Sequence, residues 1–393
     1  MKPRVVVLGG AGAMGRITAR DLARASRGAL RVVVADRVRP LERVRGVEYI
    51  EADVADRRSL ARALRGAFAV IASLPYRLNL DAMDGALEAG AHYVDLGGLF
   101  HMTRRQMARA PVFERRGLMA ILGMGSAPGI LNVLAEMGAR GMDVVRELHC
   151  LVGAVDRTRF RNRLPIDFGY APDTLLDEFA MPSAVFRDGA FVMVPPLDPT
   201  ERITVRFPSP VGALQVDSTL HSEVATLPLS FADRGIREVT FRQGFDPEFR
   251  GRLEFLVQLG LTGTDPLAVP PHINGDGVVP RQVMLALLRR LPRPAPIGKP
   301  WRYEVLRTVV RGRRGRKSVE VACDCHAGPR AGAGVGPDID TGAPPSIAVL
   351  LMLGGELPIR PGVWAPERVV PVEPFVRELR RRGMKVTRRS RSA

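Results

Sequence analysis

Residues 5–36 hold a glycine-rich turn between two strongly apolar segments, and this stretch restricts the possible fold more than any other. Four apolar residues, Val5 to Leu8, predict a strand that is buried on both faces. The turn carries three glycines in G-x-G-x-x-G spacing: Gly10, Gly12 and Gly15. We expect a helix next, with an apolar face made by Met14, Ile17, Leu22 and Ala25. A second buried strand, 32–34, then leads to Asp36.

Each residue of the turn has a physical role in binding a dinucleotide. Gly10 permits a tight turn, Gly12 lets the backbone approach a pyrophosphate, and Gly15 lets the helix and strand pack closely. The phosphates would lie on unpaired N–H groups at the positive end of the helix, around Ala13 and Met14. A glycine turn without a ligand would explain the glycines, but not the strand, helix and acid in this order.

Asp36 bears on the choice of cofactor. It lies 21 residues after Gly15, close to the spacing of about 20 for the acid that binds a ribose 2′-hydroxyl. A carboxylate there favours NAD, because it repels the 2′-phosphate of NADP. Arg37 and Arg39 offset this charge and would admit NADP. The sequence therefore predicts NAD, with NADP as the alternative.

Length and composition indicate about two packed domains in a reducing compartment. A chain of 393 residues exceeds one typical core, and 46% hydrophobic residues suffice for a packed interior. No apolar run approaches the roughly 18 residues of a membrane span, and the first strand begins so early that we expect no signal peptide. Cys150, Cys323 and Cys325 do not make a disulfide framework, which favours the cytoplasm.

The net charge of +17 comes mostly from arginines spread along the chain, with a cluster at 380–391. We expect this tail to be a solvated basic surface with a frayed end. The alternative is an acidic partner such as nucleic acid. No nucleic-acid-binding motif accompanies the charge and only 6% of residues are aromatic, so nucleic acid is not an expected partner.

The segments after Asp36 alternate between strand and helix. Strands are predicted at 47–50, 67–72, 92–94 and 118–122, with helices at 79–88 and 102–116. This alternation predicts the α/β class with a doubly wound parallel sheet of the Rossmann type. Ligands of such sheets bind at the carboxyl ends of the strands.

Polar and small residues follow these strands at the same edge. Asp53 would either contact the adenine end of a cofactor or cap the helix that begins near Asp56. Asp95 would either orient the substrate or the nicotinamide end of the cofactor, or cap its own loop, beside Gly97, which admits a close approach. The loop after the fourth strand suits a contact with the cofactor: Ser73, Leu74 and Pro75.

Residues 123–132 predict a strand that runs directly into a helix. Ser126 or Ala127 would cap this helix, and Pro128 would lie in its first turn. Its N–H groups would either hold a substrate carboxylate or form an ordinary helix start. The predicted substrate contacts are Gly97, Ser126, Pro128, Gly129 and Asn132.

From residue 146 the pattern becomes strand-rich and predicts a mixed α+β domain. Strands are expected at 147–155, 203–207, 214–216 and 238–242, with helices near 175–179, 249–259 and 281–291. Hairpins are expected at 184–193, turning at Asp188-Gly189, and at 303–323. A loop at 330–345 precedes an apolar helix, 346–353, which must be buried against the first domain, and an amphipathic helix at 373–382.

His221 and Glu223 lie two residues apart in a polar stretch of this domain. If the stretch is extended, both side chains share one face. A histidine beside a carboxylate can transfer protons near neutral pH; the alternative is a satisfied polar cluster. Cys323-Asp324-Cys325-His326 lacks a second ligand pair, so we expect alternating hairpin residues there and no metal.

Three segments of the first domain resemble the saccharopine dehydrogenase superfamily: 8–15, 93–98 and 125–132. Within it, the chain is most similar to lysine 6-dehydrogenase, through 175–177, 188–189, 341–342 and 362–367. The resemblance covers nearly the whole chain. It departs at Gly123, where that branch carries an acid, and at 221–223.

The resemblance implies a Rossmann domain, 1–145 completed by 335–393, and an inserted substrate and dimerisation domain, 146–334. It implies a homodimer that carries out NAD(P)-linked oxidation of a C–N bond in an amino acid, or the reverse. His221 with Glu223 would take the proton of the amine. The alternatives are a saccharopine or carboxylated-polyamine reductase of the same superfamily, and a non-catalytic dinucleotide sensor.

Overall fold

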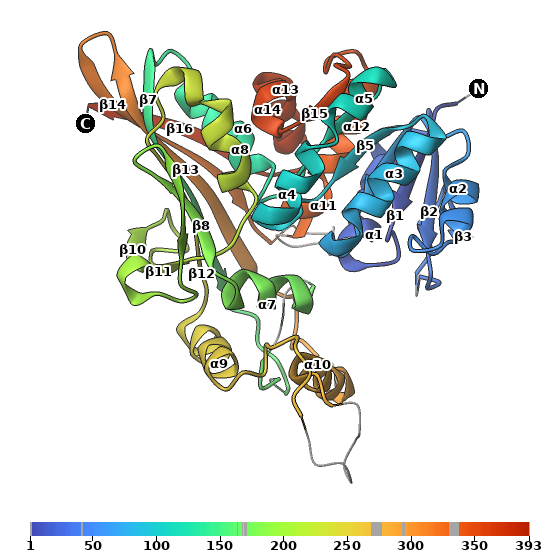
Figure 1. Ribbon diagram of the computed structural model, residues 1–393, viewed down its shortest axis with the longest axis horizontal. Coiled ribbons are helices and arrows are strands. Elements are labelled where there is room, and N and C mark those ends of the chain that lie inside the picture. Colours follow the sequence, from blue (N-terminus) through green and yellow to red (C-terminus); the bar gives the residue numbers. More distant parts are fainter. Residues whose placement is uncertain are drawn as a thin grey trace.

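The computed structural model describes residues 2–40, 42–162, 164–166, 168, 171–268, 277–292, 295–329 and 338–392. Two β-sheets organise this part of the chain. In Figure 1 the first sheet lies on one side of the view and the larger second sheet on the other, with helices between them.

The first sheet contains seven strands within the described ranges, all parallel, in the order β15-β6-β5-β4-β1-β2-β3. Their bounds are β1 (Arg4–Leu8), β2 (Arg31–Asp36), β3 (Val47–Glu51), β4 (Ala69–Ala72), β5 (His92–Asp95), β6 (Met119–Ile121) and β15 (Gly362–Trp364). The strand order reverses between β2 and β4, on either side of β1. This confirms the predicted doubly wound Rossmann sheet.

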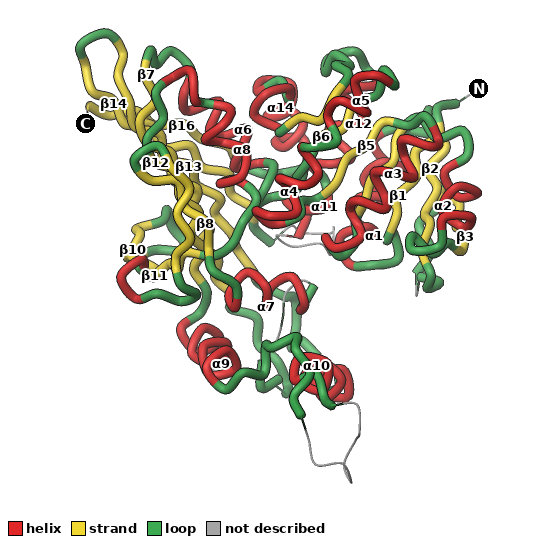
Figure 2. The backbone as a smooth tube through the Cα atoms, viewed as in Figure 1, coloured by secondary structure: helices red, strands yellow, loops and turns green. Residues whose placement is uncertain are grey.

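Helices cover both faces of the first sheet (Figure 2). Alternate residues of β1 point to opposite faces, so Val5 and Val7 join one apolar cluster while Val6 and Leu8 join another. The first cluster includes α1 (Ala13–Ala25) and α12 (Pro344–Leu353), and the second includes α2 (Arg57–Leu64), α3 (Asn79–Ala89) and α5 (Ala110–Arg115). The apolar helix predicted at 346–353 is therefore buried against the first domain, as expected.

Two helices of the first domain differ from their predicted form. The helix expected at 102–116 is two helices, α4 (Leu99–Met107) and α5, because Pro111 lacks an N–H group and its ring excludes a continuous helix through the preceding turn. In α1 the buried stripe runs through Gly15, Thr18 and Leu22, whereas Ala25 is exposed.

The second sheet is mixed, in the order β10-β11-β12-β7-β13-β14-β16, and off this path β8 pairs with β12 while β9 pairs with β8. Its strands are β7 (Val144–Asp156), β8 (Ser183–Arg187), β9 (Ala190–Val194), β10 (Ile203–Arg206), β11 (Ala213–Ser218), β12 (Glu238–Gly244), β13 (Arg302–Arg314), β14 (Lys317–Ala327) and β16 (Lys385–Ser392). Both predicted hairpins are present, and Asp188 and Gly189 have the positive φ angles, 52° and 86°, of a tight two-residue turn.

Helices α6 (Ile130–Ala139) and α8 (Glu223–Ser230) pack against the second sheet. At its far end, α7 (Pro172–Ala180), α9 (Pro247–Gln258) and α10 (Pro280–Arg290) form a small apolar cluster of their own. The single-turn 3₁₀ helices are Tyr76–Leu78, Pro199–Glu201 and Ala232–Arg234. In the described ranges no helix has the length and apolar character needed to cross a bilayer.

The C-terminal segment serves both domains. Its helices α11 (Ile339–Gly342) and α12 contact α1, and β15 extends the first sheet at its edge. Helices α13 (Pro366–Val369) and α14 (Val372–Arg381) also contact α6. Of the loop predicted at 330–345, residues 330–337 lie outside the described residues, and the remainder is largely helical rather than a loop.

The basic tail is a strand and not a frayed end, so that prediction is wrong. Residues 385–392 form β16, which pairs antiparallel with β14 from Lys385 opposite His326 to Ser392 opposite Val319. β14 would otherwise expose an unpaired edge of N–H and C=O groups, and β16 covers it. The strand belongs to the second sheet, so the predicted first-domain segment 335–393 ends before it.

Candidate active site

The glycine turn lies at the carboxyl ends of β1 and β4, and its left-handed residue is Gly9 rather than Gly10. Gly9 has φ +70°, and a Cβ there would lie 2.2 Å from the Ser73 carbonyl oxygen. Gly10 is restricted instead by Val34, whose methyl groups lie 2.7 Å from the Cβ position. The tight turn predicted at Gly10 therefore belongs to Gly9, because only that residue has a positive φ and meets the neighbouring strand's loop.

Gly15 has the predicted packing role, since a Cβ there would lie 2.3 Å from the Gly9 carbonyl oxygen. Gly12 is the N-cap residue of α1 and has no side chain to cap the helix. The amino end of α1, at Ala13 and Met14, is thus left open for an anionic group. A glycine cradle before an uncapped helix fits the diphosphate of a nicotinamide cofactor.

Asp36 is held at the end of β2 by two backbone N–H groups. Ala11 N–H donates to its Oδ2 at 2.9 Å, and Val38 N–H donates to its Oδ1 at 3.0 Å. The carboxylate therefore lies beside the glycine turn, where a ribose would be bound. Arg37 is 72% exposed and lies 4.0 Å from Asp53, a contact that solvent screens strongly.

Asp53 does not cap α2. The N-cap residue is Asp56, whose side chain accepts the N–H of Arg58, whereas Asp53 accepts the N–H of Ala55 one turn earlier. Of the two roles predicted for Asp53, the helix cap is excluded, and the contact with the adenine end of the cofactor stays a prediction.

The loop after β4 contains the three predicted residues Ser73, Leu74 and Pro75. The Ser73 carbonyl lies against Gly9, and its buried Oγ has no hydrogen-bond partner among the described residues. An orphaned hydroxyl beside the glycine turn fits a cofactor contact. The loop continues into Tyr76 and Arg77, which the sequence analysis missed although they follow the same strand.

Asp95 is a buried loop organiser, with no exposed surface, rather than a group that reaches a substrate. Its Oδ1 accepts the N–H groups of Gly123 at 2.6 Å and Gly97 at 3.0 Å. Its Oδ2 accepts from the side chains Gln106 Nε2, Tyr93 Oη and Asn79 Nδ2. Of its two predicted roles, the structure favours the loop cap, because five donors occupy the carboxylate.

Burial raises the pKa of Asp95, and the bonds from Gly123 and Gln106 oppose this shift. The sequence could not identify Gln106 or Asn79, since both are polar residues on buried helix faces and their partner Asp95 is distant in the chain. Their effect is to fix the two glycine-containing loops, at Gly97 and Gly123, that border the site.

The helix after β6 begins later than predicted. Its N-cap residue is Gly129, with φ 124°, and not Ser126 or Ala127; Pro128 precedes the helix. The Pro128 carbonyl accepts the Gly125 N–H, so the chain turns before α6 begins. Gly129 N–H donates to Asn132 Oδ1 at 2.9 Å, and the next two N–H groups donate to Gly125 and Ser126 carbonyls. These donors are therefore not free for a substrate carboxylate.

The predicted substrate contacts around this turn separate into two groups. Asn132 is 1% exposed and donates to Glu367 and Thr226, so it joins α6 to α13 and α8 in the core. Gly129 and Pro128 are also buried, and Pro128 packs on Gly97. These contacts account for the three residues by packing within the fold, and a direct substrate contact at them stays a prediction. Ser126 is partly exposed and bonds Thr341 Oγ1 at 2.9 Å, so it stays a predicted contact.

His221 and Glu223 are in contact, although not on an extended strand. β11 ends at Ser218 and α8 begins at Glu223, so the pair forms at a helix start. His221 Nδ1 bonds Glu223 Oε2, and the imidazole stacks on Phe241 with ring centroids 3.8 Å apart. Burial alone would lower the pKa of His221, but the Glu223 carboxylate outweighs it, so the pKa is raised. The predicted pairing is confirmed and its extended geometry is wrong.

Ser222, which the sequence analysis missed, ties this pair to the first domain. Its Oγ accepts the Gly98 N–H at 3.3 Å and the hydroxyl of Thr103 on α4 at 3.1 Å. His221 is therefore held within one residue of the loop that follows β5. The arrangement places a buried, paired imidazole beside the loop that follows β5, at the carboxyl edge of the Rossmann sheet.

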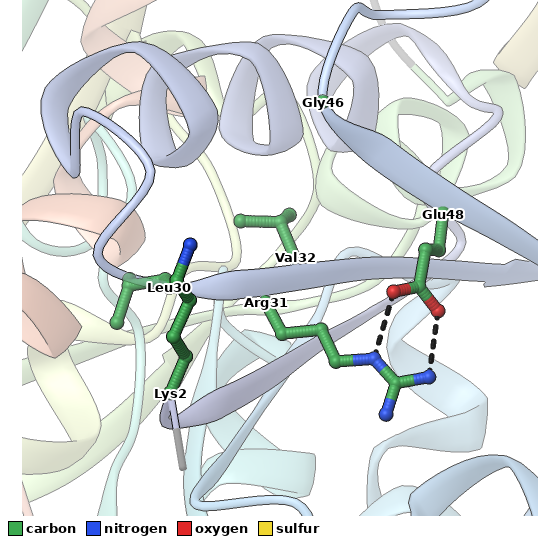
Figure 3. Close-up of a pocket in the computed structure, with 6 residues that line it drawn as sticks. All are labelled: Lys2, Leu30, Arg31, Val32, Gly46 and Glu48. Carbon is green, nitrogen blue, oxygen red and sulfur yellow. Dashed lines mark hydrogen bonds and ion pairs between the residues drawn. The ribbon is translucent and has the colours of Figure 1, made fainter.

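A surface pocket of about 380 Å³ lies at the opposite edge of the sheet, near the start of β2, and is lined by Lys2, Leu30, Arg31, Val32, Gly46 and Glu48. Figure 3 shows the exposed Arg31–Glu48 ion pair that forms one wall. Because cofactors of doubly wound sheets bind at the carboxyl ends, this pocket is separate from the candidate site.

Cys323, Asp324, Cys325 and His326 all lie on β14. Asp324 is paired with Arg307, and His326 bonds the hydroxyl of Tyr303. No group of three metal-ligating side chains occurs in the described part of the chain. The four residues are explained by strand pairing and burial.

Comparison with known proteins gives consistent matches. Residues 5–121 match the saccharopine dehydrogenase NADP binding domain, and residues 125–384 match the saccharopine dehydrogenase C-terminal domain. The chain is 25% identical to carboxyaminopropylagmatine dehydrogenase of Synechocystis, over 79% of this chain and 77% of that protein. It is 24% identical to carboxynorspermidine synthase of Vibrio cholerae, over 78% and 74%. Its fold matches apo saccharopine dehydrogenase (L-Glu forming) of Saccharomyces cerevisiae with a TM-score of 0.72 at 16% identity, covering 99% of this chain and 100% of that one.

Proposed function

The chain belongs to the saccharopine dehydrogenase family, and on that basis we propose that it catalyses hydride transfer at a carbon–nitrogen bond of an amino-acid derivative. It is an oxidoreductase with a nicotinamide cofactor, NAD or NADP. The observation that carries the proposal is the His221–Glu223 pair, which Ser222 anchors to the carboxyl edge of the cofactor domain.

We propose a carboxylated polyamine, or a related N-substituted amino acid, as the substrate. Carboxyaminopropylagmatine dehydrogenase and carboxynorspermidine synthase, the two relatives, are both named after a carboxylated amine of this kind. Lysine is the second candidate, because segments 175–177 and 362–367 are similar to lysine 6-dehydrogenase. Both substrate classes present an amine whose carbon can lose a hydride.

His221 is the proposed proton acceptor in the oxidative direction. The amine must be neutral so that its nitrogen lone pair assists the loss of hydride. Glu223 occupies Nδ1, which leaves Nε2 to take the proton, and the carboxylate stabilises the imidazolium that forms. The bound nicotinamide supplies the hydride acceptor. Confinement of the reactants between the two domains would lower the activation free energy by several kcal/mol, on the order seen for oriented reactants.

The cofactor would be held by the residues of the first domain. The N–H groups at Ala13 and Met14 would bind its diphosphate, Asp36 its adenosine ribose, and the loop at Ser73 its nicotinamide half. We propose NAD as the preferred form, because Asp36 is fixed by two N–H groups and repels a 2′-phosphate. Affinities for NADH and NADPH test this, and tighter binding of NADPH would contradict it.

Turnover of a substrate panel tests the function. Carboxynorspermidine, carboxyaminopropylagmatine, saccharopine and lysine are each incubated with NAD⁺ and NADP⁺, and reduced nicotinamide is followed by absorbance. We expect turnover of a carboxylated polyamine, loss of turnover in His221→Ala with cofactor binding intact, and wild-type turnover in the control His149→Ala. His149 lies on β7 and bonds Thr240 and Glu147. A protein that binds cofactor but oxidises no member of the panel would instead support a dinucleotide sensor.

A further inference from the structure

Asp177 on α7 is a buried carboxylate that contacts both domains. It is 2% exposed. Its Oδ2 accepts from Tyr76 Oη at 2.7 Å and Arg77 Nη2 at 2.6 Å. Its Oδ1 accepts from Arg281 Nη1 at 2.6 Å. One carboxylate thus holds two guanidinium groups and a phenol, an arrangement that fixes the position of all three.

The two sides of this contact belong to different parts of the molecule. Tyr76 and Arg77 form the 3₁₀ turn directly after the Ser73 loop, at the carboxyl end of β4. Arg281 lies on α10, and its Nε donates to the Thr262 carbonyl at 2.8 Å. In Figure 1, α7 lies between the second sheet and the projecting α9 and α10. Asp177 therefore connects the loop at 73–78, here called the cofactor-facing loop, to the outer end of the second domain.

The neighbouring residue connects the same helix to the proposed proton acceptor. The Glu178 carbonyl accepts the Leu220 N–H at 3.1 Å, one residue before His221. The Glu178 carboxylate accepts from Gln243 Nε2 at 2.9 Å. Helix α7 consequently contacts the cofactor-facing loop through Asp177 and the His221 segment through Glu178.

We propose that Asp177 is a positioning residue that clamps the cofactor-facing loop, 73–78, against the second domain and so preorganises it for the nicotinamide cofactor. The proposal rests on the proposed function, because the loop is taken to touch that cofactor. Burial and the bond to Asp177 raise the pKa of Tyr76, so its phenol stays a donor to the carboxylate and is not an acid at neutral pH. The side chain of Arg77 is 57% exposed and lies over the ring of its neighbour Tyr76, and it contacts the second domain through Asp177.

Hydrogen–deuterium exchange of the ligand-free protein tests the clamp directly. In Asp177→Asn the side chain keeps its size and loses the charge that holds two arginines. We expect amide exchange in 73–78 to become at least about fivefold faster. Affinity for NADH, measured by its fluorescence, should fall about tenfold. Asp177→Glu keeps the carboxylate and should recover part of both changes.

The matched control is Asp173→Asn, which removes a carboxylate from the first turn of the same helix and should leave both measurements at wild-type values. If Asp177→Asn does not fold, Tyr76→Phe removes one donor and should shift exchange in 73–78 in the same direction by a smaller factor. Wild-type exchange in 73–78 in a folded Asp177→Asn protein would overturn the proposal. Faster exchange without weaker NADH binding would also overturn it. A wild-type protein that binds neither NADH nor NADPH would instead overturn the proposed function, and the contact between Asp177 and the loop at 73–78 would then be tested by the exchange rates alone.

Discussion

Substitution of two glycines in the turn should separate packing from cofactor binding. In Gly15→Ala the new methyl group would lie 2.3 Å from the Gly9 carbonyl oxygen and 2.6 Å from Gly10 Cα. Both atoms belong to the backbone, so the turn itself must move. Overpacking of this kind costs about 1–3 kcal/mol, which exceeds the gain of about 1 kcal/mol from alanine in a helix. We expect lower stability together with weaker cofactor binding.

Gly12→Ala should weaken cofactor binding while changing the stability of the fold little. Gly12 has φ −68° and ψ 172°, angles that any residue adopts, and its Cβ position is 3.2 Å from the nearest neighbour, the Gly9 carbonyl oxygen. The stability cost is therefore under about 1 kcal/mol, the difference between glycine and alanine at an N-cap. The methyl group would, however, stand where the diphosphate approaches. We expect an affinity loss of at least about tenfold for NADH and NADPH.

Urea unfolding and calorimetric nucleotide titration measure the two effects on the same samples. The matched control is Gly251→Ala on α9, where a Cβ meets nothing within 4 Å, and it should be as stable as wild type or slightly more stable, with unchanged nucleotide affinity. Equal stability losses in Gly12→Ala and Gly15→Ala, or wild-type nucleotide affinity in Gly12→Ala, would refute the assignment of these two glycines.

Four further predictions concern the site and the second sheet. Because Glu223 raises the pKa of His221, the kcat/KM for amine oxidation should rise with pH through a midpoint above 6.5, and Glu223→Gln should lower that midpoint; an unchanged profile would exclude the pair as the proton acceptor. Because the pKa of His221 is higher in the folded than in the unfolded chain, the His221–Glu223 pair contributes stability that is fully present below the unfolded-state pKa. This contribution is lost as pH rises through the folded-state pKa. The free energy of unfolding, measured in urea at a series of pH values, should show this loss in wild type and a smaller one in Glu223→Gln. Asp95→Asn should destabilise the protein by about 3 kcal/mol, because an amide nitrogen would face buried donors, and chemical unfolding measures it. Deletion of 385–392 should lower stability by about 2 kcal/mol or more and promote aggregation through the exposed edge of β14, which scanning calorimetry and light scattering detect; a monodisperse protein of wild-type stability would contradict the role of β16.

The features that sequence analysis predicted correctly have local causes. Apolar runs such as Val5–Leu8 identify buried strands, and the spacing of the glycines identifies the turn that follows. The Asp188-Gly189 turn is similarly local, because two residues with positive φ suffice to define it. These signals predicted the Rossmann sheet and most strands of the second domain, which the structure confirms, and they underlie the proposed position of the cofactor.

The errors arose where distant residues decide the outcome. An acid at a strand end has the same local pattern whether it binds a ligand or organises loops, and for Asp95 the donors from Gln106 and Asn79 decide between them. The left-handed residue of the turn is Gly9 because the Ser73 carbonyl lies beside it. The arginine-rich tail pairs as a strand only because β14 offers an open edge.

Some site residues carried no usable signal. Ser222 lies between His221 and Glu223, but its role in anchoring them depends on hydrogen bonds with Gly98 and Thr103, which are remote in sequence. Asp177 lies in a short helix that the sequence predicted, but its partners come from three separate segments. Contacts between domains of this kind become visible only in the folded chain.

Calorimetric titration of the wild-type protein with NADH and with NADPH is the decisive measurement, because the proposed site depends on a dinucleotide bound at the amino end of α1. We expect saturable binding of one nucleotide per chain, with NADH the tighter ligand. A folded protein that binds neither nucleotide would contradict it.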